Sequence, residues 1–428
     1  MKAPRIHRIL SVLVLGIGLR AAAEPLTLEE ARATALRNHP QVAIARLQEL
    51  VAQEVIKQNR SAYFPTADAY LDGVDAGNRN TRILAGGLNN PVIYDRVADG
   101  LAVSELITDF GRTGNLVASA KLSAKAETAN VAATNQQILL NVDVNYFNAL
   151  QAQAVLKVAQ ETLSVRQLLV DQVTALEKNK LRSEIDVSFA EVALEQSRLI
   201  MQKAVGDAEG AQASLSAALG YRVAHHFELT KVPNVPARVP DAETLVSTAM
   251  SERPDLRRLR YQRDAAGRFA RAQKDRNYPT VAAIGEAGNA MSHDYRLPDK
   301  YAAVGIAVDF PLFAGGEYLS LQHMAELKAQ IADQALRDQE DNVSRDVRVA
   351  WLNFSTAVQR FRTTEQLLKH ANEAYSLAQA RYKIGSSSIV ELSDAQVNAT
   401  SAQIADANAR YDELIEQAIL DYQTGVLR

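Results

Sequence analysis

Two long stretches of this 428-residue chain contain no proline, and they limit the possible folds more than any other feature. One covers residues 112–179 and the other covers residues 317–384. As single α-helices, which rise about 1.5 Å per residue, each would be on the order of 100 Å long. An ordinary globular domain is much smaller than this, so the sequence predicts an elongated protein built on long helices.

Apolar residues in both stretches recur at the spacing of coiled coils. The first stretch has Leu156, Ala159, Leu163, Val170 and Val173, and the second has Leu368, Ala371, Tyr375, Ala378 and Tyr382. A seven-residue stripe then continues through Val397, Ile404, Tyr411 and Ala418. We therefore expect each long helix to be followed by a return helix, which gives two long antiparallel hairpins.

A break in the helical pattern follows each long stretch and predicts the tip of a hairpin. At the second break a glycine and three serines occupy residues 385–388, and Glu391 and Asp394 then lie three apart on one face of the next helix. Residues 178–187 look like a degenerate copy of this tip. In that copy Lys180 corresponds to Gly385 and Asp186 to Glu391, in each case 205 positions earlier.

The two halves of the chain repeat each other elsewhere as well. Arg253-Pro254 corresponds to His39-Pro40, 214 positions earlier. An internal duplication is the simplest explanation. The sequence therefore predicts a first repeat over residues 24–220, an extended linker over residues 221–240 with three prolines, and a second repeat over residues 241–428.

Each half also contains short alternating segments that are typical of β-strands. In the second half Val304, Ile306, Val308 and Phe310 alternate with small or polar residues, and a partner strand is expected near residues 281–288. In the first half the alternation covers residues 66–72 and 101–104, and turn-rich loops are expected near residues 77–91 and 289–300. Four short strands cannot close a membrane barrel, for which about eight is the usual minimum. Either they pack on helices in a soluble domain, or several chains combine their strands.

The first 23 residues have the features of a secretory signal. Lys2, Arg5 and Arg8 precede an apolar run that is too short to span a bilayer, and three alanines at 21–23 form a small-residue cleavage pattern. We expect cleavage before Glu24. A helix should start soon afterwards, because Thr27 and Glu30 have the spacing of a capping box.

Composition excludes several classes of site and partner. The chain has no cysteine, so it can form no disulfide, no thiolate metal site and no lipid anchor on an N-terminal cysteine. Four of the 47 basic residues lie in the signal segment, so 43 remain against 50 acidic residues and the mature net charge is about −7. No basic tract is present, and nucleic acid is therefore not an expected partner.

The sequence contains no recognisable catalytic or cofactor-binding pattern. The seven histidines are scattered, and the adjacent pair His225-His226 does not have the spacing of metal ligands on a helix. The three serines at 386–388 lack a nucleophile elbow, and no phosphate-binding glycine loop with lysine occurs. We therefore expect no enzyme activity, no metal and no cofactor.

Several motifs, taken together, resemble the TolC-type outer-membrane efflux proteins (outer membrane factors). They are residues 26–31 with Asn38-His39-Pro40, the segment Phe313-Ala314-Gly315-Gly316, the segment Tyr382-Lys383-Ile384-Gly385, and residues 389–395. Their order and the two-fold repeat carry the resemblance, which covers essentially the whole mature chain.

The resemblance implies a mixed α and β membrane protein that works as a homotrimer. Three chains would each contribute four strands to one barrel in the outer membrane of a Gram-negative bacterium, in contact with outer-membrane lipid, and their helical hairpins would form a periplasmic tunnel. It also implies a passive exit duct for a tripartite exporter. Its partners would be a periplasmic adaptor (membrane fusion) protein and an inner-membrane transporter, and the duct would open at its periplasmic tips.

The resemblance also assigns roles to particular residues. Glu391 and Asp394 would form two acidic rings at the periplasmic constriction, and three further residues would help to hold the tip closed: Tyr382, Gly385 and Asp186. Val304, Ile306, Val308 and Phe310 would face lipid. The surfaces gripped by the adaptor would include Lys180, Leu181, Arg182, Ser183, Ser386, Ser387 and Ser388. Some members carry an arginine where this chain has Ser387, so we expect Lys180 and Arg182 to replace that link.

Three alternatives remain open at this point. On the residues alone, Glu391 and Asp394 also fit an ordinary solvated helix face, since acidic residues are favoured in the first turn by the helix dipole. The duct could serve type I secretion of a polypeptide instead of efflux. A third possibility is a soluble periplasmic coiled-coil scaffold with small β caps.

Overall fold

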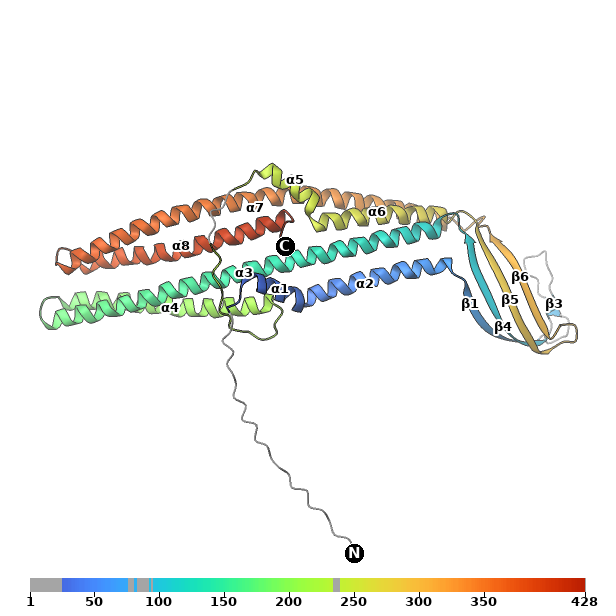
Figure 1. The fold of residues 1–428 in the computed structure, drawn as a ribbon, viewed down its shortest axis with the longest axis horizontal. Coiled ribbons are helices and arrows are strands. Elements are labelled where there is room, and N and C mark those ends of the chain that lie inside the picture. Colours follow the sequence, from blue (N-terminus) through green and yellow to red (C-terminus); the bar gives the residue numbers. More distant parts are fainter. Residues whose placement is uncertain (1–24, 76–80, 83–91, 94, 234–238, 428) are drawn as a thin grey trace, which may run out of the picture.

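A computed structural model describes residues 25–75, 81–82, 92–93, 95–233 and 239–427 of the chain. The molecule is a long rod, with a β-sheet at one end and two helical tips at the other (Figure 1). The predicted signal segment and residues 234–238 of the predicted linker lie outside the described residues.

The two long helices that the sequence predicts are confirmed. α3 covers Arg112–Lys178 and α7 covers Glu317–Lys383, and each has 67 residues. Their return helices, α4 (Glu184–Ala218) and α8 (Ile389–Gln423), have 35 residues each. In the part of the chain that the structure describes, no helix is both long enough and apolar enough to cross a membrane.

Shorter helices precede the strands in each half. α1 (Leu28–Asn38) begins at the predicted capping box, in which Thr27 and Glu30 hydrogen-bond reciprocally. His39 ends α1, and α2 (Pro40–Arg60) starts at the following proline, because a residue before proline avoids helical geometry. A 3₁₀ turn, η1 (Ser61–Tyr63), then ends α2. The second half repeats the pattern with α5 (Ala242–Glu252) and α6 (Pro254–Asp275).

Residues with positive φ recur in pairs that are 205 positions apart. They precede the long helices at Gly111 and Gly316, and they form the turns at the tips at Lys180 and Gly385. They also follow the return helices, at Gly220 and Gly425. Gly220 and Gly425 are also required by the space around them. A Cβ at residue 220 would lie about 3 Å from the backbone of His39, and a Cβ at residue 425 would lie about 3 Å from the backbone of Arg253. The backbone therefore repeats at the spacing that the sequence repeats.

Four strands form one antiparallel sheet at the end of the rod. They are β1 (Thr66–Val74), β4 (Arg96–Thr108), β5 (Thr280–His293) and β6 (Lys300–Asp309), in the order β1-β4-β5-β6. The strands are longer than the alternation in the sequence indicates, and Phe310, predicted to lie on the last strand, follows its end. The first loop also contains a two-residue pair, β2 (Thr81–Arg82) with β3 (Val92–Ile93), where only turns were expected. In the described sheet β1 and β6 each have one partner, so both are edges.

One face of this sheet is apolar. Ladder pairing places Val103, Gly285 and Val304 in one row across three strands. Val304 is 93 % exposed, and Ile306, Val308 and Phe310 are also exposed. The opposite face carries Asp68, Asp72 and Glu286, by the alternation of the pleat.

On the opposite face, two tyrosines from the edge strands cover two glycines of the inner strands. Tyr70 pairs with Gly100 and Tyr301 pairs with Gly288, so the four residues form one row across the sheet. The Tyr301 hydroxyl donates to the carbonyl of Asp99 (3.0 Å) and lies 2.8 Å from the Tyr70 hydroxyl. This row joins the two edge strands across the sheet, and it requires residues without side chains at 100 and 288.

The helices form a single curved layer with two open edges. Nearest the sheet the order is α2-α3-α6-α7, and toward the tips it is α4-α3-α8-α7, so α3 and α7 run through both parts (Figure 1). α1 packs on α3 and α5 packs on α7, halfway along the rod. One edge of the layer is therefore α2 with α4, and the other is α7.

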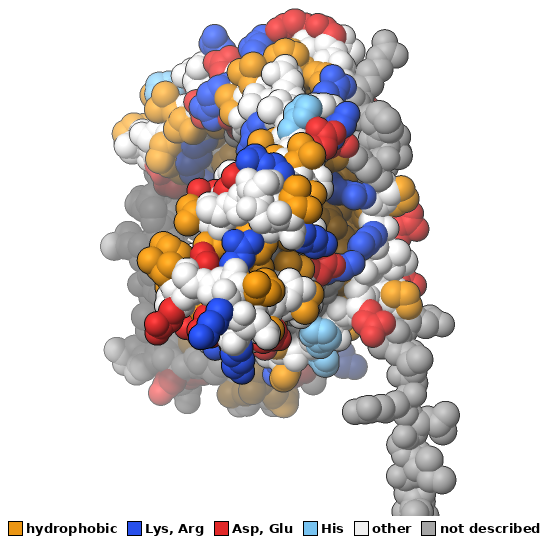
Figure 2. All heavy atoms as spheres, turned by 90° about the vertical axis from the view of Figure 1, so that its left-hand side faces the viewer, with side chains coloured by type: hydrophobic (Ala, Val, Ile, Leu, Met, Phe, Trp, Pro, Cys, Tyr) orange, Lys and Arg blue, Asp and Glu red, His pale blue; other side chains and the backbone are white. Residues whose placement is uncertain are grey.

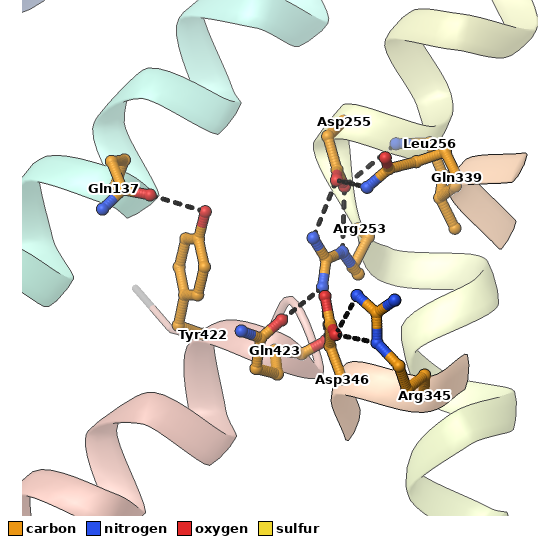
Figure 3. Close-up of polar contacts among 9 residues, drawn as sticks. All are labelled: Gln137, Arg253, Asp255, Leu256, Gln339, Arg345, Asp346, Tyr422 and Gln423. Carbon is orange, nitrogen blue, oxygen red and sulfur yellow. Dashed lines mark hydrogen bonds and ion pairs between the residues drawn. The ribbon is translucent and has the colours of Figure 1, made fainter. Parts of the chain in front are cut away.

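The middle of the rod is held together by a buried core and by a polar network. The core surrounds Tyr146 of α3, and the first part of the predicted linker runs alongside the N-terminal segment through a bridge between Leu26 and Leu229. In the network, Arg253 forms a bidentate pair with Asp255 and donates to Gln423 at the end of α8 (Figure 3). These contacts fix the start of the second repeat to the end of the chain.

We predict that Gly100→Ala destabilises the sheet, because a Cβ there would lie 2.6 Å from the Tyr301 hydroxyl and 2.8 Å from the Tyr70 ring. Overpacking of this kind typically costs about 1 to 3 kcal/mol. The measurement is the temperature at which strand structure is lost in detergent, followed by circular dichroism.

Gly305→Ala is the matched control, since its Cβ would meet nothing closer than 3.8 Å. The cost of Gly100→Ala should also fall when Tyr70 and Tyr301 are both alanine, because the three nearest contacts at residue 100 come from these two side chains. Equal melting temperatures for Gly100→Ala and Gly305→Ala would contradict the role of the tyrosine row.

Candidate functional site

The turns of the two hairpins lie together at the end of the rod opposite the sheet (Figure 1). One turn joins α3 to α4 through residues 179–183, and the other joins α7 to α8 through residues 384–388. Figure 2 views this end and shows basic, acidic and hydrophobic side chains mixed together, without a field of one sign. All the residues predicted for the constriction and for the adaptor surface belong to the two tips.

At the second tip Glu391 is paired within its own chain. Ser388 caps α8 and accepts a hydrogen bond from the backbone N–H of Glu391 (3.2 Å). The Glu391 carboxylate accepts from Arg381 Nη1 at 2.7 Å, and Arg381 also donates to the carbonyl of Ser386 (3.3 Å). A positive charge therefore compensates Glu391, although an exposed ion pair contributes little to stability.

Asp394 lies one helical turn further along α8 and is exposed. Within the described residues its carboxylate has no hydrogen bond or ion pair. Of the two acidic positions predicted for the constriction, only Asp394 therefore presents an uncompensated charge.

Asp186, which corresponds to Glu391 in the first tip, is oriented differently. Its carboxylate turns back and accepts from the backbone N–H and the hydroxyl of Ser183, at 3.1 and 2.9 Å, which completes a capping box at the start of α4. The two equivalent acids therefore act in different ways: Asp186 caps its own helix, and Glu391 spans its turn to Arg381.

Arg182 connects the first tip to the second. Its guanidinium lies 4.4 Å from the centroid of the Tyr382 ring and donates to the Tyr382 carbonyl (3.2 Å). Beneath this contact Tyr382 packs with Leu169, Val173, Ile389 and Leu392. Burial raises the pKa of Tyr382, and its hydroxyl has no hydrogen-bond partner in the described part of the chain.

The remaining predicted tip residues form the end surface. Lys180 and Gly385 both adopt left-handed backbone geometry at the turns. Leu181 is 70 % exposed and Ile384 is 80 % exposed, so each turn presents one apolar side chain to solvent. Ser183, Ser386 and Ser388 are exposed, and Ser387 is half-buried.

Arg381 is the tip residue that the sequence analysis did not assign to the site. The sequence does contain a feature that could have identified it. Arg381 and Glu391 lie the same number of residues before and after Ser386, at the centre of the turn, and residues placed in this way face each other across a hairpin. Among the described residues, no cluster of three histidine or acidic side chains could hold a metal ion.

Comparison with known proteins identifies the family. The profile of the family described as "Outer membrane efflux protein" matches residues 31–221 and 245–426. Outer membrane protein TolC of Vibrio cholerae serotype O1 is 24 % identical over 426 residues, covering 92 % of this chain and 89 % of TolC. Alkaline protease secretion protein AprF of Pseudomonas aeruginosa is 23 % identical, covering 96 % of this chain and 86 % of AprF.

A solved structure shows the same fold. The outer-membrane channel CmeC of Campylobacter jejuni superimposes with a TM-score of 0.79 at 17 % identity, covering 99 % of this chain and 93 % of CmeC. The sheet at one end, the long hairpins and the paired tips thus agree with the family profile over nearly the whole chain. The chain belongs to the outer membrane efflux protein family and is an outer-membrane channel.

Proposed function

We propose that this chain is the passive exit duct of a tripartite efflux system, closed at rest by contacts between its helical tips. The observation that carries the proposal is the link from Arg182 of the first tip to Tyr382 of the second. It joins the two hairpins at the end of the rod farthest from the membrane sheet. Breaking it removes one of the contacts that hold the two hairpins together near the tips.

The open edges of the fold support a homotrimer. Unpaired N–H and C=O groups along β1 and β6 are costly in lipid, and pairing β6 of one copy with β1 of the next satisfies them. The two edges are different surfaces, so the contact is head-to-tail and closes into a ring. In a trimer three sheets of four strands form one barrel, with Val304, Ile306 and Val308 facing lipid.

The helix layer offers a matching pair of apolar edges. Ile44, Leu47, Val51 and Val55 line an open groove of about 670 Å³ on α2 and α3. On α7, the helix at the other edge, Leu319, Leu327 and Ile331 are exposed, and Leu327 and Ile331 also line an open groove with α6. We infer that α7 of the neighbouring copy fills the groove on α2 and α3, so that the same rotation closes the barrel and the tunnel.

The tips are the proposed docking surface for a periplasmic adaptor, with an inner-membrane transporter supplying the energy. Exposed Leu181 and Ile384 give the adaptor apolar contacts, and Lys180 and the serines of the second turn give it polar ones. Engagement would separate the hairpins, break the contact between Arg182 and Tyr382 and widen the ring of Asp394 carboxylates.

Type I secretion remains the second candidate, and the similarity to a protein named for alkaline protease secretion favours it. A deletion strain separates the two functions. Sensitivity to small toxic compounds with normal protein export supports efflux, whereas loss of one exported protein with unchanged sensitivity supports secretion.

We predict that Asp394→Ala weakens cation selectivity more than Glu391→Ala does. Asp394 presents a free charge, while Arg381 compensates Glu391. Acidic rings concentrate cations at a pore entrance. The measurement is the reversal potential of single channels in planar bilayers under a salt gradient, and Glu191→Ala, an exposed carboxylate on α4, is the control. Equal selectivity in Asp394→Ala and in the unmodified channel would remove Asp394 from the constriction.

We also predict that Arg182→Ala opens the tip. The cation–π contact and the hydrogen bond together contribute about 1 to 3 kcal/mol per chain, so the closed state should lose about fivefold or more in population for each chain. The measurement is the mean single-channel conductance and open probability. Arg198→Ala is the control, because Arg198 is an exposed arginine paired only with Glu195 on its own helix. Unchanged currents in Arg182→Ala would contradict a closed state that depends on this link.

A further inference from the structure

Arg166 is a buried arginine between the two hairpins, and no role has yet been assigned to it. It lies on α3, nearer the middle of the hairpin than the tip contacts, and only 4 % of the residue is exposed. Its Nη1 donates to the hydroxyl of Ser393 (3.2 Å) and its Nη2 lies 3.5 Å from the Ser393 carbonyl. Ser393 is on α8, between Glu391 and Asp394. The contact therefore crosses from the first hairpin to the helix that carries the acidic residues.

No carboxylate compensates this charge. In the part of the chain that the structure describes, Arg166 forms no ion pair, and the electrostatic neighbour it has is Tyr375 of α7. Burial lowers the pKa of the Arg166 guanidinium, which means that its surroundings disfavour the charged form. The group that hydrogen-bonds it, Ser393, and its electrostatic neighbour, Tyr375, are both neutral.

Arg32 shows what a compensated arginine looks like in the same molecule. Its Nε donates to the buried carboxylate of Asp143 at 2.7 Å, and a second bond makes the pair bidentate. Hydrogen bonding to Asp143 raises the pKa of Arg32, the opposite direction to Arg166. The difference lies in the partner, because both arginines are at helix contacts inside the rod.

A buried charge with incomplete compensation costs free energy, and that cost is relieved when water reaches it. Arg166 and Ser393 belong to different hairpins, so separating the hairpins exposes the guanidinium. The free-energy cost of burying the Arg166 charge is therefore present in the closed state and is relieved when the tip opens. Arg182 acts in the other direction, since its contacts with Tyr382 are lost when the hairpins separate.

We propose that Arg166 biases the closed channel toward opening, in opposition to the link between Arg182 and Tyr382. The balance of these two arginines sets how much free energy an adaptor must supply to open the tip. This inference rests on the proposed function, because it requires that the channel opens by separation of the two hairpins.

A purely structural role for Arg166 makes the opposite prediction. If the bonds to Ser393 simply hold the hairpins together, their removal loosens the tip and increases leakage. If the buried charge favours opening, its replacement by an apolar side chain of similar length closes the channel further. The sign of the change separates the two roles.

The test uses Arg182→Ala as the background, because a decrease in open probability can be measured only in a channel that opens often. Adding Arg166→Met, an unbranched apolar side chain, should lower the open probability of single channels in planar bilayers several-fold. Adding Arg166→Lys, which keeps the charge, should leave it as high as in the background. Arg198→Met, at an exposed arginine of α4, is the control for loss of a positive charge. Higher opening in the Arg166→Met double variant, or no change, overturns the proposal.

The lysine variant keeps the test decisive if the methionine variant fails to assemble. A channel with Arg182→Ala and Arg166→Lys that has a lower open probability than Arg182→Ala alone would also contradict an opening bias. Failure of the inference is distinguishable from failure of the proposed function. If Arg182→Ala itself does not open the channel, the gating proposal fails. If Arg182→Ala opens it and Arg166→Met does not reverse this, only the role of Arg166 fails.

Discussion

The backbone of the two edge strands imposes the strongest constraint on this fold. A strand in lipid has no water to hydrogen-bond its free N–H and C=O groups, so an open edge is not a stable end state. β1 follows α2 after the short turn η1, and β6 is followed by α7 with no other helix or strand between them. The edge strand and the edge helix on each side are thus consecutive in the chain. In the proposed trimer, a single rotation that pairs the strands also brings α2 of one copy against α7 of the next, so sheet and helix layer would close by the same operation.

At the opposite end, the proposed gating depends on contacts between the tips that must be able to break. The helices along the rod are held by buried apolar residues, and the middle is reinforced by the pairs of Arg32 with Asp143 and Arg253 with Asp255. The tips have a small apolar cluster shared by both hairpins and the contact of Arg182 with Tyr382. The buried, uncompensated Arg166 lies just behind them. This distribution places more of the buried contacts in the middle of the rod than at the tips, which agrees with the proposed gating at the tips.

Much of the fold could be predicted from the sequence, because the signals for it are local. The absence of proline over residues 112–179 and 317–384 permits the long helices, the breaks near Lys180 and Gly385 mark where they end, and His39-Pro40 and Arg253-Pro254 divide the short ones. Strand alternation identified all four main strands but not their full length. Gly100 and Gly288 break the alternation, and the reason for them, the tyrosines that cover them from neighbouring strands, is visible only when the strands are paired. Side-chain orientation at the tips was not predictable. Asp186 and Glu391 occupy equivalent positions, yet one turns to Ser183 and the other to Arg381, because their competing partners differ between the two turns.

Native mass spectrometry of the complex extracted from outer membranes in detergent tests the central claim most directly. It counts the chains in the assembly without assuming a substrate or a pump. The proposed homotrimer predicts complexes of three chains. Folded single chains would contradict head-to-tail closure, because they leave both strand edges and the groove on α2 unfilled, and closed complexes of another size would contradict the trimer.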